Sequence, residues 1–380
     1  MKKKILSALA ILLIPVLLAG CWNYRSLDQI SIVAGMALDR DEETGSYRIT
    51  FEIVDTTKNV KQEGVKAMVL ESHGETIFEA VRDAKRRISN KIYFGQMETV
   101  IISEEIARTV DIGDLLDFFM RDAEVRETIV ITVSREHYAC DLITIEGIGH
   151  PLVSYEMEKI IMEDNKVTSS IPFTQLYNIN EVLHDEGLQL VLPAFHNADN
   201  HGEIATETDG AAVYKGQRLI GFLTPEQTKY FLFVVNKVQG GVLTCASTGE
   251  GPADTTLEIS KSVTKRSFAL QDGRLVMKLS IETDAYLNEA NTPIDSLDEA
   301  SIDAIRLQVA SKLMRGISDT IATVQSQFNS DIFGFGSLVY KHNPKLWAQF
   351  KDQWDSLFPD LEVSIECKVN IVNTASMRER

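Results

Sequence analysis

The sequence is poor in cysteine, in positive charge and in long apolar runs. It holds only 4 cysteines among 380 residues, and Cys140, Cys245 and Cys367 are too far apart for a C-x-x-C metal or redox motif. A chain of this length builds its core without disulfides, so we expect three small buried thiols. One disulfide with a free third cysteine is the alternative.

Beyond the N-terminus, no apolar run reaches the roughly 20 residues that a membrane-spanning helix needs. The N-terminus itself has the order of an export signal: Lys2–Lys4, then the apolar run Ile5–Ala19 interrupted by Pro15. Because Leu18-Ala19-Gly20 directly precedes Cys21, the segment is typical of a bacterial lipoprotein signal, in which the thiol takes a diacylglycerol before cleavage. We predict a signal peptide over 1–20 and a lipid anchor at Cys21. An ordinary signal with an incidental cysteine and an uncleaved anchor helix are the alternatives.

The scarcity of positive charge excludes some partners. Lys and Arg number 38 against 55 Asp and Glu, for a net charge of −17, and loss of Lys2–Lys4 with the signal would leave 35 against 55, or −20. So acidic a chain is a poor ligand for nucleic acid, and anionic lipid headgroups repel it. We therefore expect no nucleic-acid partner and a body that stands off the bilayer.

Hydrophobic periodicity predicts strands and helices throughout the mature chain. Alternating strands are expected at 31–39, 47–54, 67–71, 99–103, 127–134, 188–195, 210–215, 218–223, 255–262, 274–283 and 361–371. Helices are expected from 76, over 112–120, in two pieces within 152–185, from the capping box at Thr224, over 297–328, and from Asn343-Pro344. This pattern predicts a multidomain α+β fold, with mostly antiparallel or mixed sheets flanked by helices.

The most loop-like segment is Asn197–Gly202, which we take as the domain boundary. It separates an N-terminal region, 21–200, from a C-terminal α+β domain over 203–373. For the N-terminal region we leave open a division into two α+β subdomains with a break near 135–150, and 374–380 is a tail.

The chain offers no catalytic constellation. It has no G-x-S-x-G elbow, no S-x-x-K and no glycine-rich phosphate loop after a strand. His184, His196 and His201 lie close together in sequence beside several acids, but their spacing matches no standard zinc pattern, and solvent exposure explains them. We predict no enzyme, no cofactor and no metal site.

Asp331-Ile332-Phe333-Gly334-Phe335-Gly336 stands out because two aromatic residues alternate with two glycines. Either the turn folds over the core of its own domain, or an exposed ring anchors a partner. We expect Phe333 to be buried and leave Phe335 open.

These features also carry a family resemblance. The matching stretches are Cys21-Trp22 with Leu27–Ile30, Val33–Asp39, Asp209–Tyr214 with Leu219–Leu223, Asp331–Gly336, Asn343–Trp347 and Trp354 through Phe358-Pro359. Because these stretches follow one another in the family's order, the chain resembles the Ger(x)C family, the lipoprotein C subunits of spore nutrient-germinant receptors.

The resemblance implies three α+β domains and a non-enzymatic subunit anchored through Cys21 to the outer face of the inner spore membrane. It further implies assembly with two membrane-embedded receptor subunits in a complex that responds to small nutrients. The residues alone leave two rivals: a solute-binding lipoprotein that feeds a transporter, which would have a doubly wound two-lobed fold, and a surface hydrolase, which the missing motifs disfavour.

Overall fold

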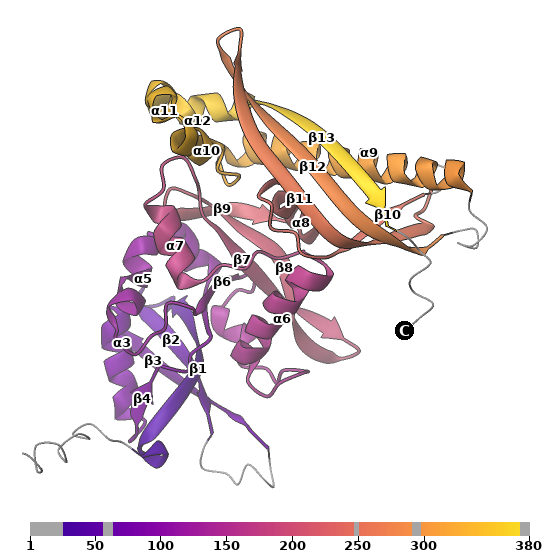
Figure 1. The fold of residues 1–380 in the computed structure, drawn as a ribbon. Helices are drawn as coiled ribbons and strands as arrows, with labels where there is room; N and C mark the ends of the chain where they lie inside the picture. The colour runs from indigo at the N-terminus through magenta and orange to yellow at the C-terminus, as the bar shows by residue number, and fades with distance from the viewer. Residues whose placement is uncertain (1–25, 56–63, 247–250, 291–297, 373–380) are drawn as a thin grey trace, which may run out of the picture.

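The computed structural model describes residues 26–55, 64–246, 251–290 and 298–372. The N-terminal part of this chain builds a nine-stranded sheet in the order β3-β2-β1-β5-β6-β7-β8-β9, with β4 beside β1 (Figure 1). The strands are β1 (Ile30–Arg40), β2 (Tyr47–Val54), β3 (Ala67–Gly74), β4 (Lys91–Tyr93), β5 (Thr99–Ile102), β6 (Val130–Ser134), β7 (Val191–Asn200), β8 (Glu203–Lys215) and β9 (Arg218–Leu223).

The sheet is mixed, because crossover helices join its central strands. The pairs β1–β5, β5–β6 and β6–β7 are parallel, whereas hairpins make both ends of the sheet antiparallel. The connecting helices are α3 (Ile77–Asp83), η2 (Ala84–Arg86), α4 (Glu104–Thr109), α5 (Ile112–Arg121), η3 (Ala139–Leu142), α6 (Val153–Val167) and α7 (Leu176–Leu183), and η1 (Leu27–Gln29) precedes β1.

Helices cover both faces of this sheet. On one face, α3, α4, α5 and α7 bury residues such as Ile106 and Leu115 against Met36 and Leu38 of β1. On the other, η3 and α6 pack against residues that include Ala37. Successive residues of a strand point to opposite faces, so β1 contributes to both cores, as its almost continuous burial requires.

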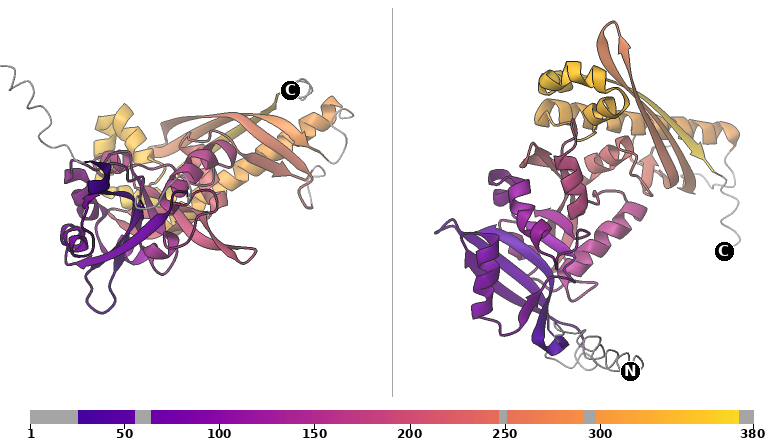
Figure 2. Two further views of the ribbon diagram at one scale, coloured as in Figure 1. Left: turned by 90° about the horizontal axis from the view of Figure 1, so that it is seen from below. Right: turned by 60° about the vertical axis from the view of Figure 1, so that its left-hand side comes forward.

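The C-terminal part forms a second sheet in the order β10-β11-β12-β13, in which β13 is parallel to β12. Helix α9 runs along one face of this sheet, which projects away from the larger one (Figure 2). The elements are α8 (Pro225–Val234), β10 (Val242–Cys245), β11 (Thr255–Gln271), β12 (Arg274–Glu289), α9 (Glu299–Thr323), the π-helix η5 (Val324–Phe328), α10 (Phe335–His342), α11 (Pro344–Phe350), η6 (Lys351–Gln353), α12 (Trp354–Leu357), η7 (Phe358–Asp360) and β13 (Glu362–Ile371).

The multidomain α+β fold expected from the sequence is confirmed, with several local corrections. The segment 197–202 is not a loop: Asn197–Asn200 pair with β8, and only His201 and Gly202 make the turn, so the sheet continues through the expected boundary. Strands β11 and β12 are far longer than 255–262 and 274–283. Helix α9 begins at Glu299 with Asp298 as N-cap and changes to a π-helix at Val324. The described residues hold two sheets rather than one for each of three domains.

Strand β8 joins the two halves of the molecule. Ala212 and Tyr214 face the core beneath α4 and α5, whereas Ala211 and Val213 face the C-terminal core with α8 and the second sheet. A single strand therefore has one face in each core. Because neither face can be exposed without loss of buried apolar area, the two halves are held together by burial.

Candidate interaction surface

Cys21, the predicted acylation site, lies outside the described residues, which begin at Ser26. The described chain enters through η1 and β1, and β1 pairs in parallel with β4, so that Ile30 lies opposite Lys91. The surface around β4 therefore lies beside the start of β1, which is the end of the described chain nearest in sequence to the predicted anchor.

The three histidines do not converge. His184 ends α7, is exposed, and its Nδ1 lies 2.7 Å from the carbonyl oxygen of Asn180. His196 lies on β7, 3.8 Å from the Glu207 carboxylate, and His201 occupies the β7–β8 turn with φ of 56°. Within the described ranges, no group of three His, Cys, Asp or Glu side chains could hold a metal ion.

The three cysteines that the structure describes are free thiols, but only Cys245 is fully buried. Cys140 and Cys367 are half-buried, so the expectation of three buried residues is wrong for these two. Cys367 lies on β13, which pairs with β12 on one side only, and this position at the sheet edge leaves the side chain partly accessible. Burial still raises the pKa of the Cys140 and Cys367 thiols to about 12, which makes both poor nucleophiles.

The aromatic turn is part of the core. Phe333 and Phe335 are 1 % and 0 % exposed, which confirms the expected burial of Phe333 and shows that Phe335 shares it. Their rings stack with centroids 5.2 Å apart, and the Phe333 ring lies 6.1 Å from that of Phe231 on α8. Neither ring is free to anchor a partner.

A buried carboxylate holds this turn in place. Asp331 accepts hydrogen bonds from the backbone N–H of Phe335 (3.0 Å) and of Gly336 (2.8 Å), and from the indole Nε1 of Trp354 (3.2 Å). Burial raises the pKa of Asp331 to about 6 although these three donors oppose the shift. Every contact of the carboxylate is internal, so it positions the start of α10.

Two glycines let the aromatic turn dock against the segment that precedes β7. A Cβ on Gly336 would lie 2.7 Å from Cη2 of Trp347 and 2.9 Å from Cα of Gly187. The approach is fixed by hydrogen bonds from Ser337 N to Gly187 O (2.9 Å) and from Trp347 Nε1 to Glu186 (2.7 Å). This contact is a second connection between the two halves of the chain.

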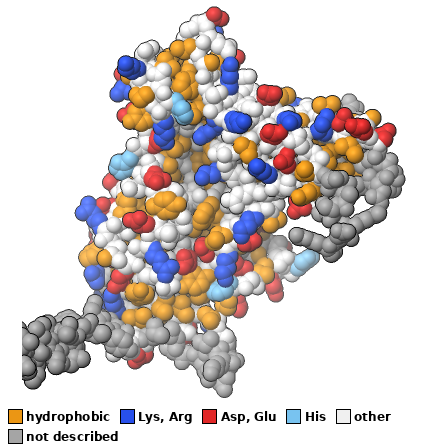
Figure 3. Space-filling view, viewed as in Figure 1, with side chains coloured by type: hydrophobic (Ala, Val, Ile, Leu, Met, Phe, Trp, Pro, Cys, Tyr) orange, Lys and Arg blue, Asp and Glu red, His pale blue; other side chains and the backbone are white. Residues whose placement is uncertain are grey.

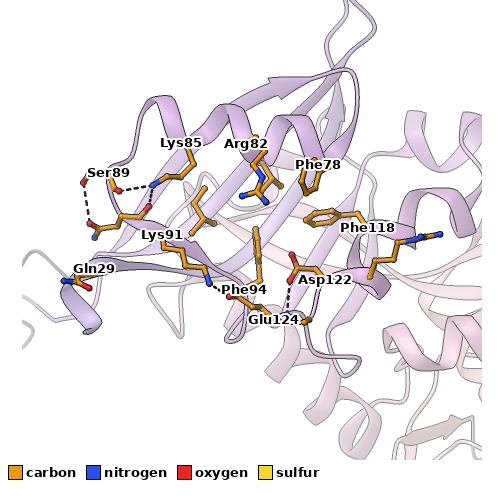
Figure 4. A pocket seen from close by; sticks show the side chains of 15 residues that line it. Gln29, Phe78, Arg82, Lys85, Ser89, Lys91, Phe94, Phe118, Asp122 and Glu124 are labelled. Carbon is orange, nitrogen blue, oxygen red and sulfur yellow. Dashed lines mark hydrogen bonds and ion pairs between the residues drawn. The ribbon is translucent and has the colours of Figure 1, made fainter. Parts of the chain in front are cut away.

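A hollow of the surface lies elsewhere, between α3, α5 and β4 (Figure 4). We call this hollow of about 840 Å³ the α3–α5 groove. Its floor includes the rings of Phe94 and Phe118, whose centroids are 6.2 Å apart, and Phe78 meets Phe118 edge-on at 6.4 Å. A second hollow of about 730 Å³ shares Phe78, Phe118 and Arg121 with it.

The rim of the α3–α5 groove is polar and mostly basic. The guanidinium carbon of Arg82 lies 4.7 Å from the centroid of the Phe78 ring, and Lys91 pairs with Glu124 across the groove. Phe78 itself is 54 % exposed, more than Phe173, Tyr177 or Tyr340. An aromatic floor with a cationic rim suits an amphiphilic or anionic surface, and it contains no nucleophile paired with a base.

Sequence reasoning missed this groove because its walls come from distant segments. The helix beginning after Thr76 and the helix over 112–120 were both expected, but nothing in the sequence indicated that they lie side by side. The available signal was the run Arg82–Arg87, four basic residues in an acidic chain.

Two family models match the chain almost from end to end. The "Spore germination protein N-terminal domain" matches residues 23–197, and "Spore germination B3/ GerAC like, C-terminal" matches residues 209–375. No helix in the described part of the chain is long and apolar enough to cross a membrane.

Individual relatives agree with these models. The chain is 24 % identical over 365 residues to "Spore germination protein B3" of Bacillus subtilis (strain 168), with 94 % of each chain covered. It is 24 % identical over 406 residues to "Spore germination protein KC" of the same strain, covering 98 % of this chain and 97 % of the relative. The solved structure entitled "Crystal Structure of the GerBC protein" matches with a TM-score of 0.57 at 20 % identity, over 89 % of this chain and 97 % of that one, and shows a shared fold.

These matches first define a class: a multidomain α+β spore germination protein. Within that class, the chain belongs to the Ger(x)C family, as the motifs from Val33 to Phe358 indicate.

Proposed function

We propose that the chain is the lipid-anchored, non-catalytic subunit of a spore nutrient-germinant receptor. The observation that carries the proposal is the full-length match to spore germination proteins in a chain whose N-terminus has the order of a lipoprotein signal. Diacylglycerol on Cys21 would tether the body to the outer face of the inner spore membrane.

The absence of a catalytic arrangement among the described residues supports a binding role. Buried carboxylates accept hydrogen bonds from the protein's own backbone: Asp331 holds the aromatic turn, and Glu52 accepts from the backbone N–H of Val153 (2.6 Å) and of Ser154 (2.9 Å) at the start of α6. A carboxylate that caps a helix is stabilised by the N–H groups that it satisfies, so these hydrogen bonds serve the fold.

The proposed partners are two membrane-embedded receptor subunits, and the complex would respond to a small nutrient. The fold disfavours the rival, a solute-binding lipoprotein, because that class pairs two doubly wound parallel sheets around a cleft. Here each sheet combines parallel with antiparallel pairs, and β8 ties the two halves together.

The division into domains also remains a proposal: 21–200 and 203–373, with a tail over 374–380. Family models that end at 197 and begin at 209 support it. On this view the two domains share the β7–β8 hairpin and unfold as coupled units.

Affinity capture tests the receptor assignment. The chain carries a tag after Arg380, is captured from detergent-solubilised spore membranes, and its partners are identified by peptide mass spectrometry. We expect two multi-span membrane proteins in amounts comparable to the bait. Capture of a transporter permease in their place would support the solute-binding function and contradict the proposal.

A further inference from the structure

One short segment of this acidic protein carries a concentrated positive charge. Residues 82–87, at the end of α3 and in η2, contain Arg82, Lys85, Arg86 and Arg87 against the single acid Asp83, a net charge of +3 in a chain whose net charge is −17. We call this segment the basic turn. All four of its basic side chains are exposed.

Local contacts hold the basic turn in shape but do not neutralise it. Arg86 and Arg87 share the carboxylate of Asp83, at 3.2 and 2.5 Å, and Arg86 remains 81 % exposed. The Lys85 ammonium donates to the carbonyl oxygens of residues 88, 89 and 90, which fixes the end of η2 without cancelling the charge. The charge is therefore presented to solvent from a rigid turn.

The basic turn adjoins the end of the chain that carries the predicted anchor. Lys91 of β4, four residues beyond the basic turn, lies opposite Ile30 at the start of β1. The nine residues from Cys21 to Ile30 span at most about 32 Å when fully extended. A lipid on Cys21 therefore keeps this end of the body within that distance of the membrane surface.

The surface views agree with this placement. Lys and Arg side chains follow the edge of the molecule formed by α3, beside the point where the described chain begins (Figure 3). Phe78, one helical turn before Arg82, is 54 % exposed and supplies an aromatic ring next to the charge. Aromatic and basic side chains together are typical of surfaces that lie at a membrane interface.

We propose that the basic turn binds anionic phospholipid headgroups and so fixes the orientation of the anchored body on the membrane. The proposal rests on the anchoring at Cys21 put forward above. It refines the expectation that the whole body stands off the bilayer: the α3 edge faces the lipid, and the acidic remainder points away. Attraction to an anionic surface falls off within a Debye length, about 8 Å at physiological salt. Only a segment that is held at the surface is therefore attracted appreciably.

The test uses the full processed lipoprotein reconstituted into vesicles. One set contains phosphatidylglycerol and phosphatidylcholine, and the other contains phosphatidylcholine alone. A fluorophore on Asn90→Cys, next to the basic turn, reports its distance from nitroxide-labelled headgroups through quenching, and a fluorophore on Asp272→Cys at the β11–β12 turn serves as the distant reference.

We expect quenching of the Asn90→Cys label on the anionic vesicles only, with loss of quenching at high salt. Arg82→Glu/Arg86→Glu should shift the equilibrium between docked and free orientations by at least roughly 30-fold, because the loss of each basic side chain near the surface alone removes about a fivefold factor. The matched control is Arg306→Glu/Arg315→Glu on α9, where Arg306 pairs with Asp303 at 2.9 Å much as Arg86 pairs with Asp83.

The outcomes separate this proposal from the anchoring on which it rests. Protein that fails to float with either set of vesicles contradicts the anchor. Protein that floats with both sets, but whose label is unquenched or is quenched equally with and without anionic lipid, overturns the role of the basic turn. An unchanged signal in Arg82→Glu/Arg86→Glu does the same, and quenching that requires added receptor subunits assigns the surface to a protein partner in place of lipid.

Discussion

Replacing Phe333 with Ala tests whether the aromatic turn is a core element. The side chain is 1 % exposed, stacks on Phe335 and contacts Phe231, so truncation removes a buried ring from between α8 and the start of α10. Truncating a fully buried Phe typically costs about 3–5 kcal/mol, part of it for the cavity that remains. At roughly 2–4 °C per kcal/mol for chains of 150–250 residues, with less for longer ones, the melting temperature should fall by about 5–15 °C.

The assay is thermal unfolding of Phe333→Ala followed by circular dichroism, with Phe173→Ala as the matched control. Phe173 is 41 % exposed, so the same truncation there removes much less buried area and should shift the midpoint only slightly. Wild-type melting of Phe333→Ala would refute the burial argument. If both substitutions lowered the melting temperature equally, the loss of stability could not be assigned to the buried core.

Three further predictions concern the aromatic turn and the histidines. Asp331→Asn should destabilise the protein more at pH 4 than at pH 7. The pKa of Asp331 in the folded protein, about 6, lies above the ordinary value of 3.8. The stability that the protonated carboxyl group contributes is therefore complete at low pH, and up to about 3 kcal/mol of it is lost as the pH rises through 6. Urea melts at the two pH values measure the difference, and a difference of opposite sign would contradict the raised pKa. Gly336→Ala should cost about 1–3 kcal/mol because its Cβ meets Trp347 and Gly187, and calorimetric unfolding would show it. Replacing His184, His196 and His201 together with Ala should leave melting and germination nearly unchanged; stoichiometric zinc in the wild-type protein, lost in this variant, would overturn that view.

Local structure followed from the sequence wherever a strong local signal existed. The strand Tyr47–Val54 alternates cleanly, and the boundaries agree. The capping box of Thr224 and Gln227 also forms as expected, with hydrogen bonds in both directions. In both cases the physical cause lies within a few residues.

The errors arose where distant segments decide the structure. Polar residues at 197–202 looked like a loop, but pairing with β8 satisfies their backbone groups and makes them strand. The outer part of β11 lacks clear apolar alternation and is strand because it pairs with β12. The α3–α5 groove depends in the same way on which helices become neighbours, and periodicity does not reveal that.

The central claim is that Cys21 anchors a subunit needed for the germination response. The most direct measurement is mass spectrometry of the N-terminal peptide from spores that carry wild-type or Cys21→Ala protein, together with nutrient-induced germination of the same spores. The account predicts a diacylglyceryl Cys21 at the mature N-terminus of the wild type, and unprocessed precursor with little germination in the variant. A Cys21→Ala protein that is cleaved and supports normal germination would contradict it.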